Sequence, residues 1–216
     1  MEDSAVMKVL SDVGAIITNS HIVYTSGRHG TAYVNKDALY VHPESTSQLC
    51  KKMAAPYEKE KIDVVAGPTV GGVILSQWIA YYLNQSKTTG ETLSVYAEEE
   101  AKGEEKTRIF KRGYDAHIRG KRVLVVEDVV TTGGSARKVI EAVRQLGGNV
   151  IGLTLLCNRG GIIPAEVGGV PIQALTNIKM DSYDAAECPM CKQKVPINTN
   201  VGKGREFLEK QGLPVS

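Results

Sequence analysis

Two adjacent carboxylates, Glu127 and Asp128, are followed at residues 131–135 by the hydroxyl- and glycine-rich loop TTGGS. Neighbouring carboxylates repel one another and are costly to bury unpartnered. We therefore expect them to face solvent, a cation or a polyol that donates hydrogen bonds to them. The loop opens a predicted helix, with Ser135 at its N-cap, and the free amides of such a helix start favour an anion. A sugar phosphate fits both halves of this arrangement, although TTGGS alone is also typical of an ordinary strand-to-helix turn.

A second glycine loop, AGPTVGG at residues 66–72, also lies between a predicted buried strand and a predicted helix. Such a loop suits a pyrophosphate, which Thr69, Val70 and Gly71 would hold through backbone amides. A purely structural glycine turn is the alternative. Neither loop has the spacing of a Walker motif or of a dinucleotide fingerprint.

The elements around these loops predict an α/β fold with a central, mainly parallel sheet covered by helices on both faces. We expect helices over the first ten or so residues, 43–60, 73–84 and 135–147, and two short strands around the turn at residues 26–30. The predicted strands of the sheet are residues 62–67, 92–97, 121–128, 149–159 and 169–175. No linker separates a second domain, so residues 1–216 are predicted to form one domain.

Composition excludes several classes of function. The 216 residues carry a net charge of only +2, which gives no basic surface for nucleic acid. No apolar run approaches the ~20 residues of a membrane span. The acidic N-terminus lacks the pattern of a signal peptide, so a cytoplasmic location is expected.

The run VLVVEDVVTTGGS, residues 123–135, resembles the phosphoribosyl-pyrophosphate signature of the type I phosphoribosyltransferases. The resemblance implies their fold, with a core at roughly residues 41–180 and a small N-terminal hood at roughly residues 1–40 with part of the C-terminal tail. It implies a diphosphate held at the second glycine loop together with Mg²⁺. The residues that it assigns to the ribose and the 5-phosphate are Glu127, Asp128, Val129, Val130, Thr131, Thr132, Gly133, Gly134 and Ser135.

Within that superfamily the chain most resembles the orotate phosphoribosyltransferases. Residues 26–40 resemble their hood segment, which implies that Tyr33, Val34 and Lys36 bind the base. Arg137 matches an arginine that contacts orotate, whose carboxylate a guanidinium can meet bidentately; a surface arginine is the alternative. The family implies a homodimer that makes orotidine 5-monophosphate and pyrophosphate.

The sequence also departs from the family pattern. Thr25 and Gly71 stand where lysines are usual, and Glu98 and Glu99 replace a basic pair in the segment that resembles the mobile catalytic loop. In that segment Lys102 is kept, as a candidate catalytic residue.

Glu104 occupies the usual histidine position of the same segment. Residues 98–105 are interpreted as a loop that closes over the site, with Lys102, Lys106 and Arg108 as its cations. The alternative is that residues 104–114 form a solvated hairpin arm with its charges outward. The acidic run keeps two other functions open. One is a purine or other base-salvage phosphoribosyltransferase, and the other is a non-catalytic regulator that binds phosphoribosyl pyrophosphate.

Cys188 and Cys191 have the spacing of zinc ligands, but a tetrahedral structural site needs four. Cys50, Cys157 or a second subunit would have to complete it. The interpretation that we favour from sequence is two reduced thiols in a tail turn shaped by Pro189.

Overall fold

The computed structural model describes residues 2–103, 105–178 and 180–214, without the side chains of residues 2, 3, 102 and 105. The chain divides into two compact units. The larger comprises residues 1–6 and 42–178, and the smaller comprises residues 7–41 and 179–216. Within the described residues, no helix is both long and apolar enough to span a membrane.

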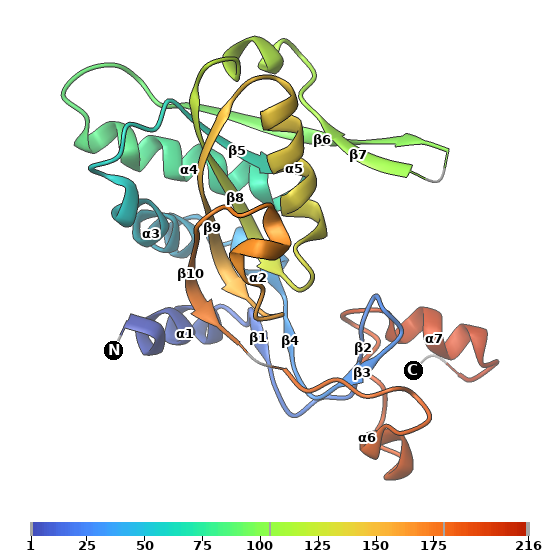
Figure 1. The fold of residues 1–216 in the computed structure, drawn as a ribbon. Coiled ribbons are helices and arrows are strands. Elements are labelled where there is room, and N and C mark those ends of the chain that lie inside the picture. Colours follow the sequence, from blue (N-terminus) through green and yellow to red (C-terminus); the bar gives the residue numbers. More distant parts are fainter. Residues whose placement is uncertain (1, 104, 179, 215–216) are drawn as a thin grey trace. The chain divides into compact units, whose positions relative to one another are not determined.

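The larger unit is built on a six-stranded sheet in the order β10-β9-β8-β5-β6-β7 (Figure 1). All neighbours are parallel except β6 and β7, which form an antiparallel hairpin. The predicted mainly parallel sheet is therefore confirmed. The strands are β5 (Val64–Pro68), β6 (Leu93–Lys102), β7 (Glu105–Ile109), β8 (Arg122–Val130), β9 (Asn149–Asn158) and β10 (Ile172–Asn177).

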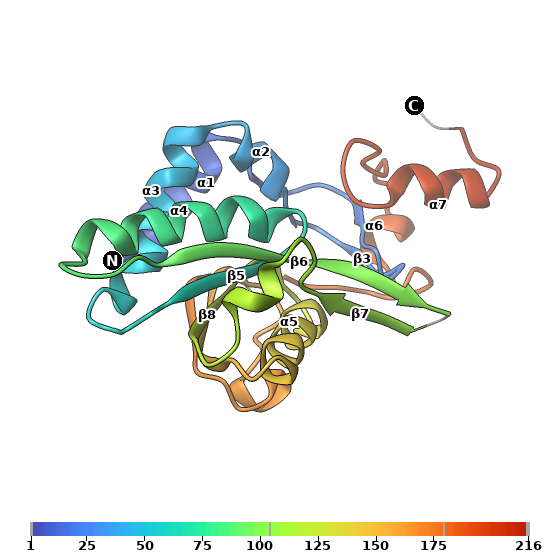
Figure 2. The same ribbon diagram turned by 90° about the horizontal axis from the view of Figure 1, so that it is seen from above.

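Helices cover both faces of this sheet. Helices α3 (Pro43–Ala54) and α4 (Gly71–Ser86) lie on one face, and α5 (Gly134–Gln145) lies on the other (Figure 2). Successive strand side chains point to opposite faces, so Val123 and Val125 pack in the cluster that includes the apolar side of α5, while Leu124 is buried on the other face. Short 3₁₀ turns complete the unit: η1 (Ala55–Tyr57), η2 (Tyr114–His117) and η3 (Pro164–Val167).

The acidic segment after the second predicted strand is a hairpin and not an irregular loop. Strand β6 continues past residue 97 to Lys102, and Glu99 lies opposite Arg108 in β7. Gly103 turns the chain with a positive φ of 64°. The described residues of this segment therefore belong to an antiparallel hairpin.

The smaller unit joins the N-terminal region to the C-terminal tail through very short elements. Backbone hydrogen bonds link His29 to Tyr183 in both directions, and the amide of Asn198 donates to the carbonyl of His21. A pair of short strands, β2 and β3, is present as predicted, but β3 includes His29 and Gly30 of the predicted turn, so the second strand begins earlier than expected. The smaller unit contains the end of α1 (Glu2–Asp12), β1 (Ile16–Ile17), β2 (Ile22–Val23), β3 (His29–Gly30), β4 (Tyr33–Val34), α2 (Lys36–Tyr40), α6 (Pro189–Lys192) and α7 (Gly204–Lys210).

Candidate functional site

Strand β8 carries the acid pair in its interior. The strand continues beyond Asp128 to Val130, which pairs with Asn158 of β9, so the expectation that the strand ends at the acids is wrong. Glu127 is 7% exposed and Asp128 is 5% exposed. The pair is thus largely withdrawn from solvent, which leaves hydrogen bonds, a cation or a ligand to meet its charge.

The environment of Glu127 opposes its ionisation. Burial raises the pKa of its carboxyl above the ordinary value of 4.5, and the neighbouring charge of Asp128 raises it further. Hydrogen bonds from the backbone of Asp128 and the hydroxyl of Ser135, together with the charge of Arg108, act in the opposite direction. Asp128 is itself constrained, because its Oδ1 accepts the amide of Val129 at 2.6 Å. The protein therefore holds two adjacent, largely buried carboxyl groups near the carboxyl end of the central strand β8.

A cavity of about 220 Å³ lies at the end of β8. Helix α5 begins at Gly134 and its N-cap is Gly133, whose φ is 75°, so the predicted N-cap at Ser135 is wrong by two residues. Ser135 instead lies in the first turn, where its hydroxyl is available to Arg108 and Glu127. The cavity is lined by Glu127, Val129, Val130, Thr131, Thr132, Gly133, Gly134, Ser135 and Ala136.

Gly160, in the loop after β9, packs against Thr131, one of the residues that line this cavity. Its amide donates to the carbonyl of Val130 at 3.0 Å. A Cβ at this position would lie 1.6 Å from the carbonyl oxygen of Thr131, so only glycine allows the loop that contains residues 131–135 to pack here. The sequence shows Gly160 only as one member of a Gly-Gly pair, and its contact with Thr131 depends on the fold.

The second glycine loop connects β5 to α4 at the same edge of the sheet as the first, because β5 and β8 are parallel neighbours. Its geometry requires Gly67 and Gly72: a Cβ on Gly67 would lie 2.6 Å from the Cα of Gly72. The amide of Thr69 donates to the carbonyl of Ala97 in β6 at 3.0 Å.

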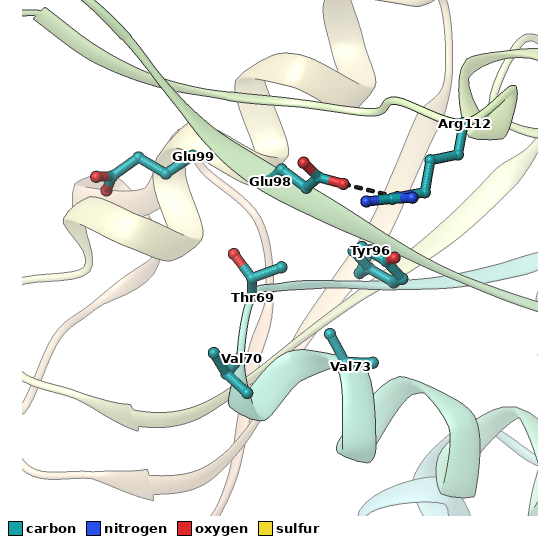
Figure 3. Close-up of a pocket in the computed structure, with 7 residues that line it drawn as sticks. All are labelled: Thr69, Val70, Val73, Tyr96, Glu98, Glu99 and Arg112. Atoms are coloured by element: carbon teal, nitrogen blue, oxygen red, sulfur yellow. Dashed lines mark hydrogen bonds and ion pairs between the residues drawn. The ribbon is translucent and has the colours of Figure 1, made fainter.

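A cavity of about 460 Å³ lies beside this second loop (Figure 3). In the close-up, Glu98 points toward Arg112 and Glu99 extends to the other side of β6, with Thr69 and Val70 at the start of α4. The cavity is lined by Thr69, Val70, Val73, Tyr96, Glu98, Glu99 and Arg112.

Arg108 of β7 joins the two loops. One terminal guanidinium nitrogen donates to the hydroxyl of Thr69 at 3.1 Å, and the other donates to the hydroxyl of Ser135 at 3.3 Å. The second nitrogen also lies 3.9 Å from Glu99. Only 12% of the Arg108 side chain is exposed. A positive charge is thus fixed between the loops, next to the buried acid pair.

The acids of the hairpin are paired and not left to repel an anion. Glu98 lies 2.9 Å from the Nε of Arg112, and Glu99 lies 3.0 Å from the Nζ of Lys106. Glu100 makes a third ion pair, with Lys111 at 3.7 Å. Each of these three glutamates therefore has a basic partner from β7 or from the segment that follows it.

The predicted base-binding residues lie in both units. Arg137 lies in α5, where it is half-exposed and its Nε lies 3.6 Å from Glu141. Tyr33 and Val34 form β4 of the smaller unit, and Lys36 begins α2. The side chain of Val34 is buried.

The remaining candidates are Lys102 and the paired cysteines. Lys102 ends β6, and its side chain lies outside the described part of the chain. Cys188 and Cys191 lie next to His21 and His29 in the smaller unit. Both cysteines are free thiols and Pro189 begins α6 between them, as the sequence predicted, but the sequence did not show the two histidines beside them.

Comparison with known proteins defines the class first: a model of the phosphoribosyl transferase domain family matches residues 36–166. The chain is 33% identical over 198 residues to the orotate phosphoribosyltransferase of Caldanaerobacter subterraneus subsp. tengcongensis, a match that covers 91% of this chain and 96% of that one. The chain belongs to the phosphoribosyltransferase family and, within it, to the orotate phosphoribosyltransferases.

Two solved structures share its fold. The orotate phosphoribosyltransferase of Aeropyrum pernix superposes with a TM-score of 0.63 at 22% identity, covering 95% of this chain and 97% of that one. The enzyme of Mycobacterium tuberculosis H37Rv, in complex with 5-phospho-alpha-D-ribosyl 1-diphosphate, superposes with a TM-score of 0.60 at 21% identity, covering 82% and 97%. At these identities the likeness bears on the fold alone.

The raised pKa of Glu127 predicts how stability depends on pH. The folded protein keeps the Glu127 proton to a higher pH than the unfolded chain does. The unfolded chain therefore binds fewer protons in the window between 4.5 and the raised pKa, and the free energy of unfolding falls as pH rises through it. We expect Glu127→Gln to remove this contribution to the slope of the unfolding free energy against pH, which is at most about 1.4 kcal/mol per pH unit.

Urea denaturation at a series of pH values measures this slope in the wild type, in Glu127→Gln and in Glu58→Gln, which alters an exposed glutamate of the same unit. The Glu58 variant should keep the wild-type slope. Equal slopes for the wild type and Glu127→Gln would contradict the prediction.

Proposed function

We propose that the protein transfers the phosphoribosyl group of phosphoribosyl pyrophosphate to orotate and releases pyrophosphate. The observation that carries the proposal is the pair of loops at the ends of β5 and β8, held together by Arg108 beside a buried acid pair. Ligands of open α/β sheets bind at this edge. Orotate as the acceptor rests on the relatives, which carry the name orotate phosphoribosyltransferase over most of the chain.

Each half of the donor has a counterpart in the site. We assign the 5-phosphate to the cavity formed by residues 129–135, where the first amides of α5 have no partner within the helix. Glu127 and Asp128 accept hydrogen bonds from the ribose hydroxyls, which supply the donors that a buried acid pair needs. The amides of Val70 and Gly71 receive the diphosphate, with Arg108 between it and the 5-phosphate loop. The amide of Thr69, which the sequence also suggested, is instead bonded to the carbonyl of Ala97.

Magnesium accompanies the diphosphate in this proposal. Mg²⁺ is usually held by one or two carboxylates together with substrate phosphates and water, and not by an all-protein cage. The site fits that pattern. Within the described residues, Glu127 and Asp128 belong to no three-ligand group, so the protein supplies at most this pair of carboxylates. Bound magnesium would neutralise charge on the departing diphosphate.

The reaction is a substitution at the anomeric carbon of the ribose. The bond from this carbon to the diphosphate oxygen breaks, and its electron pair leaves with the pyrophosphate. A ring nitrogen of orotate forms the new bond and loses its proton to the departing pyrophosphate or to water. Positive charge develops on the sugar ring, and the carboxylate of Asp128 stabilises it at short range. Glu127, whose pKa burial raises, contributes charge only in its ionised form. Arg108 stabilises the negative charge that grows on the leaving group.

We assign recognition of the base to Arg137, Tyr33, Val34 and Lys36. Lys102, at the end of β6, is assigned to the leaving group together with Arg108. Arg137 is held in α5 by a long ion pair with Glu141, which an orotate carboxylate can replace at little cost because both side chains are half-exposed. The acidic hairpin is compatible with turnover, since its glutamates are neutralised by basic partners.

A panel of bases tests the function. The protein, supplied with phosphoribosyl pyrophosphate and Mg²⁺, should form a nucleotide with orotate and not with adenine, guanine, xanthine or uracil. Asp128→Asn should lower kcat by about 100-fold or more, because it removes charge that stabilises the transition state, while circular dichroism stays unchanged. Product with a purine and none with orotate would contradict the assignment of the base, and full activity in Asp128→Asn would remove this residue from the site.

Arg108 provides a second test. Arg108→Gln should raise the KM for phosphoribosyl pyrophosphate by roughly 10- to 100-fold, the cost of about 1.5–3 kcal/mol for losing charged hydrogen bonds. The KM for orotate should change less. Arg108→Lys should be intermediate, since it keeps the charge without the fork, and the exposed Arg119→Gln is the control. An unchanged KM for the donor in Arg108→Gln would contradict the bridge between the loops.

The homodimer and the cytoplasmic location that are expected for the family are part of the same proposal. Light scattering coupled to size-exclusion chromatography should give twice the mass of the 23.3 kDa chain. A mass of one chain at micromolar concentration would contradict the dimer.

A further inference from the structure

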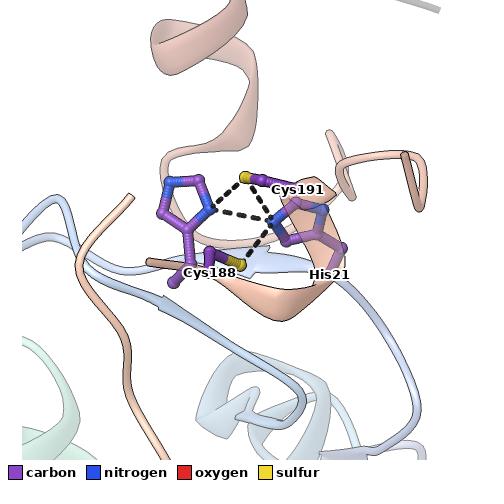
Figure 4. A group of neighbouring side chains, drawn as sticks. His21, Cys188 and Cys191 are labelled. Carbon is purple, nitrogen blue, oxygen red and sulfur yellow. Dashed lines mark hydrogen bonds between the residues drawn. The ribbon is translucent and has the colours of Figure 1, made fainter. Parts of the chain in front are cut away.

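Four side chains of types that can bind a metal meet in the smaller unit, and none of them belongs to the residues assigned to phosphoribosyl pyrophosphate. His21 and His29 come from the N-terminal hairpin, and Cys188 and Cys191 come from the tail. Their ligand atoms all lie within 4.8 Å of one another. Figure 4 shows both sulfur atoms directed at one ring nitrogen of His21.

The separations match the edges of a tetrahedral metal centre. Zinc lies about 2.3 Å from a thiolate sulfur and about 2.0 Å from an imidazole nitrogen, so a tetrahedral angle puts nitrogen and sulfur ligands about 3.5 Å apart. The Nε2 of His21 lies 3.6 Å from the sulfur of Cys188 and 3.7 Å from that of Cys191. The Nδ1 of His29 lies 3.4 Å from the sulfur of Cys191.

The two imidazole nitrogens are closer than zinc would hold them. They lie 2.8 Å apart, whereas two nitrogen ligands of a tetrahedral zinc are about 3.3 Å apart. An ion between them would separate the rings by about half an ångström. This is a small adjustment, and it replaces a contact between two nitrogens by two bonds to a cation.

His21 is already oriented as a ligand. Its Nδ1 lies 2.8 Å from the carbonyl oxygen of Val195, and since a carbonyl only accepts, the ring proton resides on Nδ1. The Nε2 lone pair therefore points into the cluster. A metal-bound histidine usually donates its second N–H in this way, which fixes both its tautomer and its direction.

Backbone structure and burial hold the other ligands in place. His29 exchanges two backbone hydrogen bonds of 2.8 Å with Tyr183, and its ring packs against that of Phe207 at 4.8 Å between centroids. The side chains of His21, His29 and Cys188 are at most 1% exposed. Burying these polar atoms costs free energy unless hydrogen bonds or a metal ion replace their contacts with water.

We propose that His21, His29, Cys188 and Cys191 bind one Zn²⁺ that ties the C-terminal tail to the N-terminal hairpin. Two sulfur and two nitrogen ligands in a tetrahedral arrangement select zinc among common metals. Four protein ligands leave no open position, so the ion is structural and not catalytic.

The smaller unit needs such a link. Its strands are two residues long and its two chain segments, residues 7–41 and 179–216, are connected only through the larger unit. Domains below roughly 70–80 residues rarely obtain enough stability from an apolar core alone, and a structural metal is a common supplement. The zinc supplies a cross-link between segments that are far apart in sequence.

The test uses the untagged full-length protein, purified without chelators, with metal content measured by mass spectrometry. We expect about one zinc per chain in the wild type and less than about a tenth of that in Cys188→Ser/Cys191→Ser and in His21→Ala. Cys50→Ala and His42→Ala are the matched controls, because they remove a thiol of the larger unit and an exposed imidazole. Both should keep the zinc.

Replacing zinc by cobalt keeps the test decisive where a variant fails to fold. The wild-type protein with Co²⁺ should show the intense visible bands of a tetrahedral ion and a thiolate-to-cobalt charge-transfer band. Chelation should lower the first unfolding midpoint by about 5 °C or more, and added zinc should restore it. These readouts need no orotate turnover, so a metal site and a failed assignment of the base are distinguishable.

Wild-type protein without zinc, and without these cobalt bands, would overturn the site. Zinc retained in the double cysteine variant would overturn its ligands, and a stoichiometric metal other than zinc would overturn its identity. A disulfide between Cys188 and Cys191 in freshly purified protein, seen as the loss of two titratable thiols, would also overturn the proposal.

Discussion

Arg108 is the side chain on which the arrangement of the candidate site depends. Its guanidinium spans the hydroxyls of Thr69 and Ser135 and so fixes the separation of the two glycine loops. The same positive charge partly offsets the burial of Glu127. Because Arg108 comes from β7, the hairpin supplies a positive charge between the two glycine loops, next to the buried acid pair.

This arrangement changes the meaning of the acidic hairpin. From sequence alone, five glutamates between residues 98 and 105 oppose binding of a diphosphate. In the structure, Glu98, Glu99 and Glu100 each lie within ion-pair distance of a basic side chain. The pairs arise because the antiparallel strand β7 supplies Lys106 and the segment that follows it supplies Lys111 and Arg112. Such exposed pairs add little stability, but they lower the local negative charge, and Arg108 remains directed at the loops.

Sequence predicted the parts of the site that are contiguous and missed those that depend on folding. The run of residues 123–135 specifies a buried strand, an acid pair and a glycine loop, so local spacing was sufficient. The role of Gly160 depends on its packing against Thr131, and no local pattern encodes that contact. The predicted N-cap at Ser135 was wrong because Gly133 adopts the left-handed conformation and starts the helix earlier. Sequence identified Arg108 as one of three cations near the site but did not distinguish it from the others.

The cysteine pair shows the same limit at longer range. Spacing made Cys188 and Cys191 candidates and then left them two ligands short, because His21 and His29 are remote in sequence: Cys188 and His21 are 167 positions apart. The histidines share no motif with the cysteines, and they approach them only because the tail returns to pair with the N-terminal hairpin. The two units thus reach stability by different means. The sheet of the larger unit buries apolar residues on both faces, whereas the smaller unit, with strands of two residues, relies on backbone pairing and on the proposed cross-link. Loss of the metal would therefore loosen the tail and the turn at residues 26–30 first, while the loops joined by Arg108 would keep the support of the sheet.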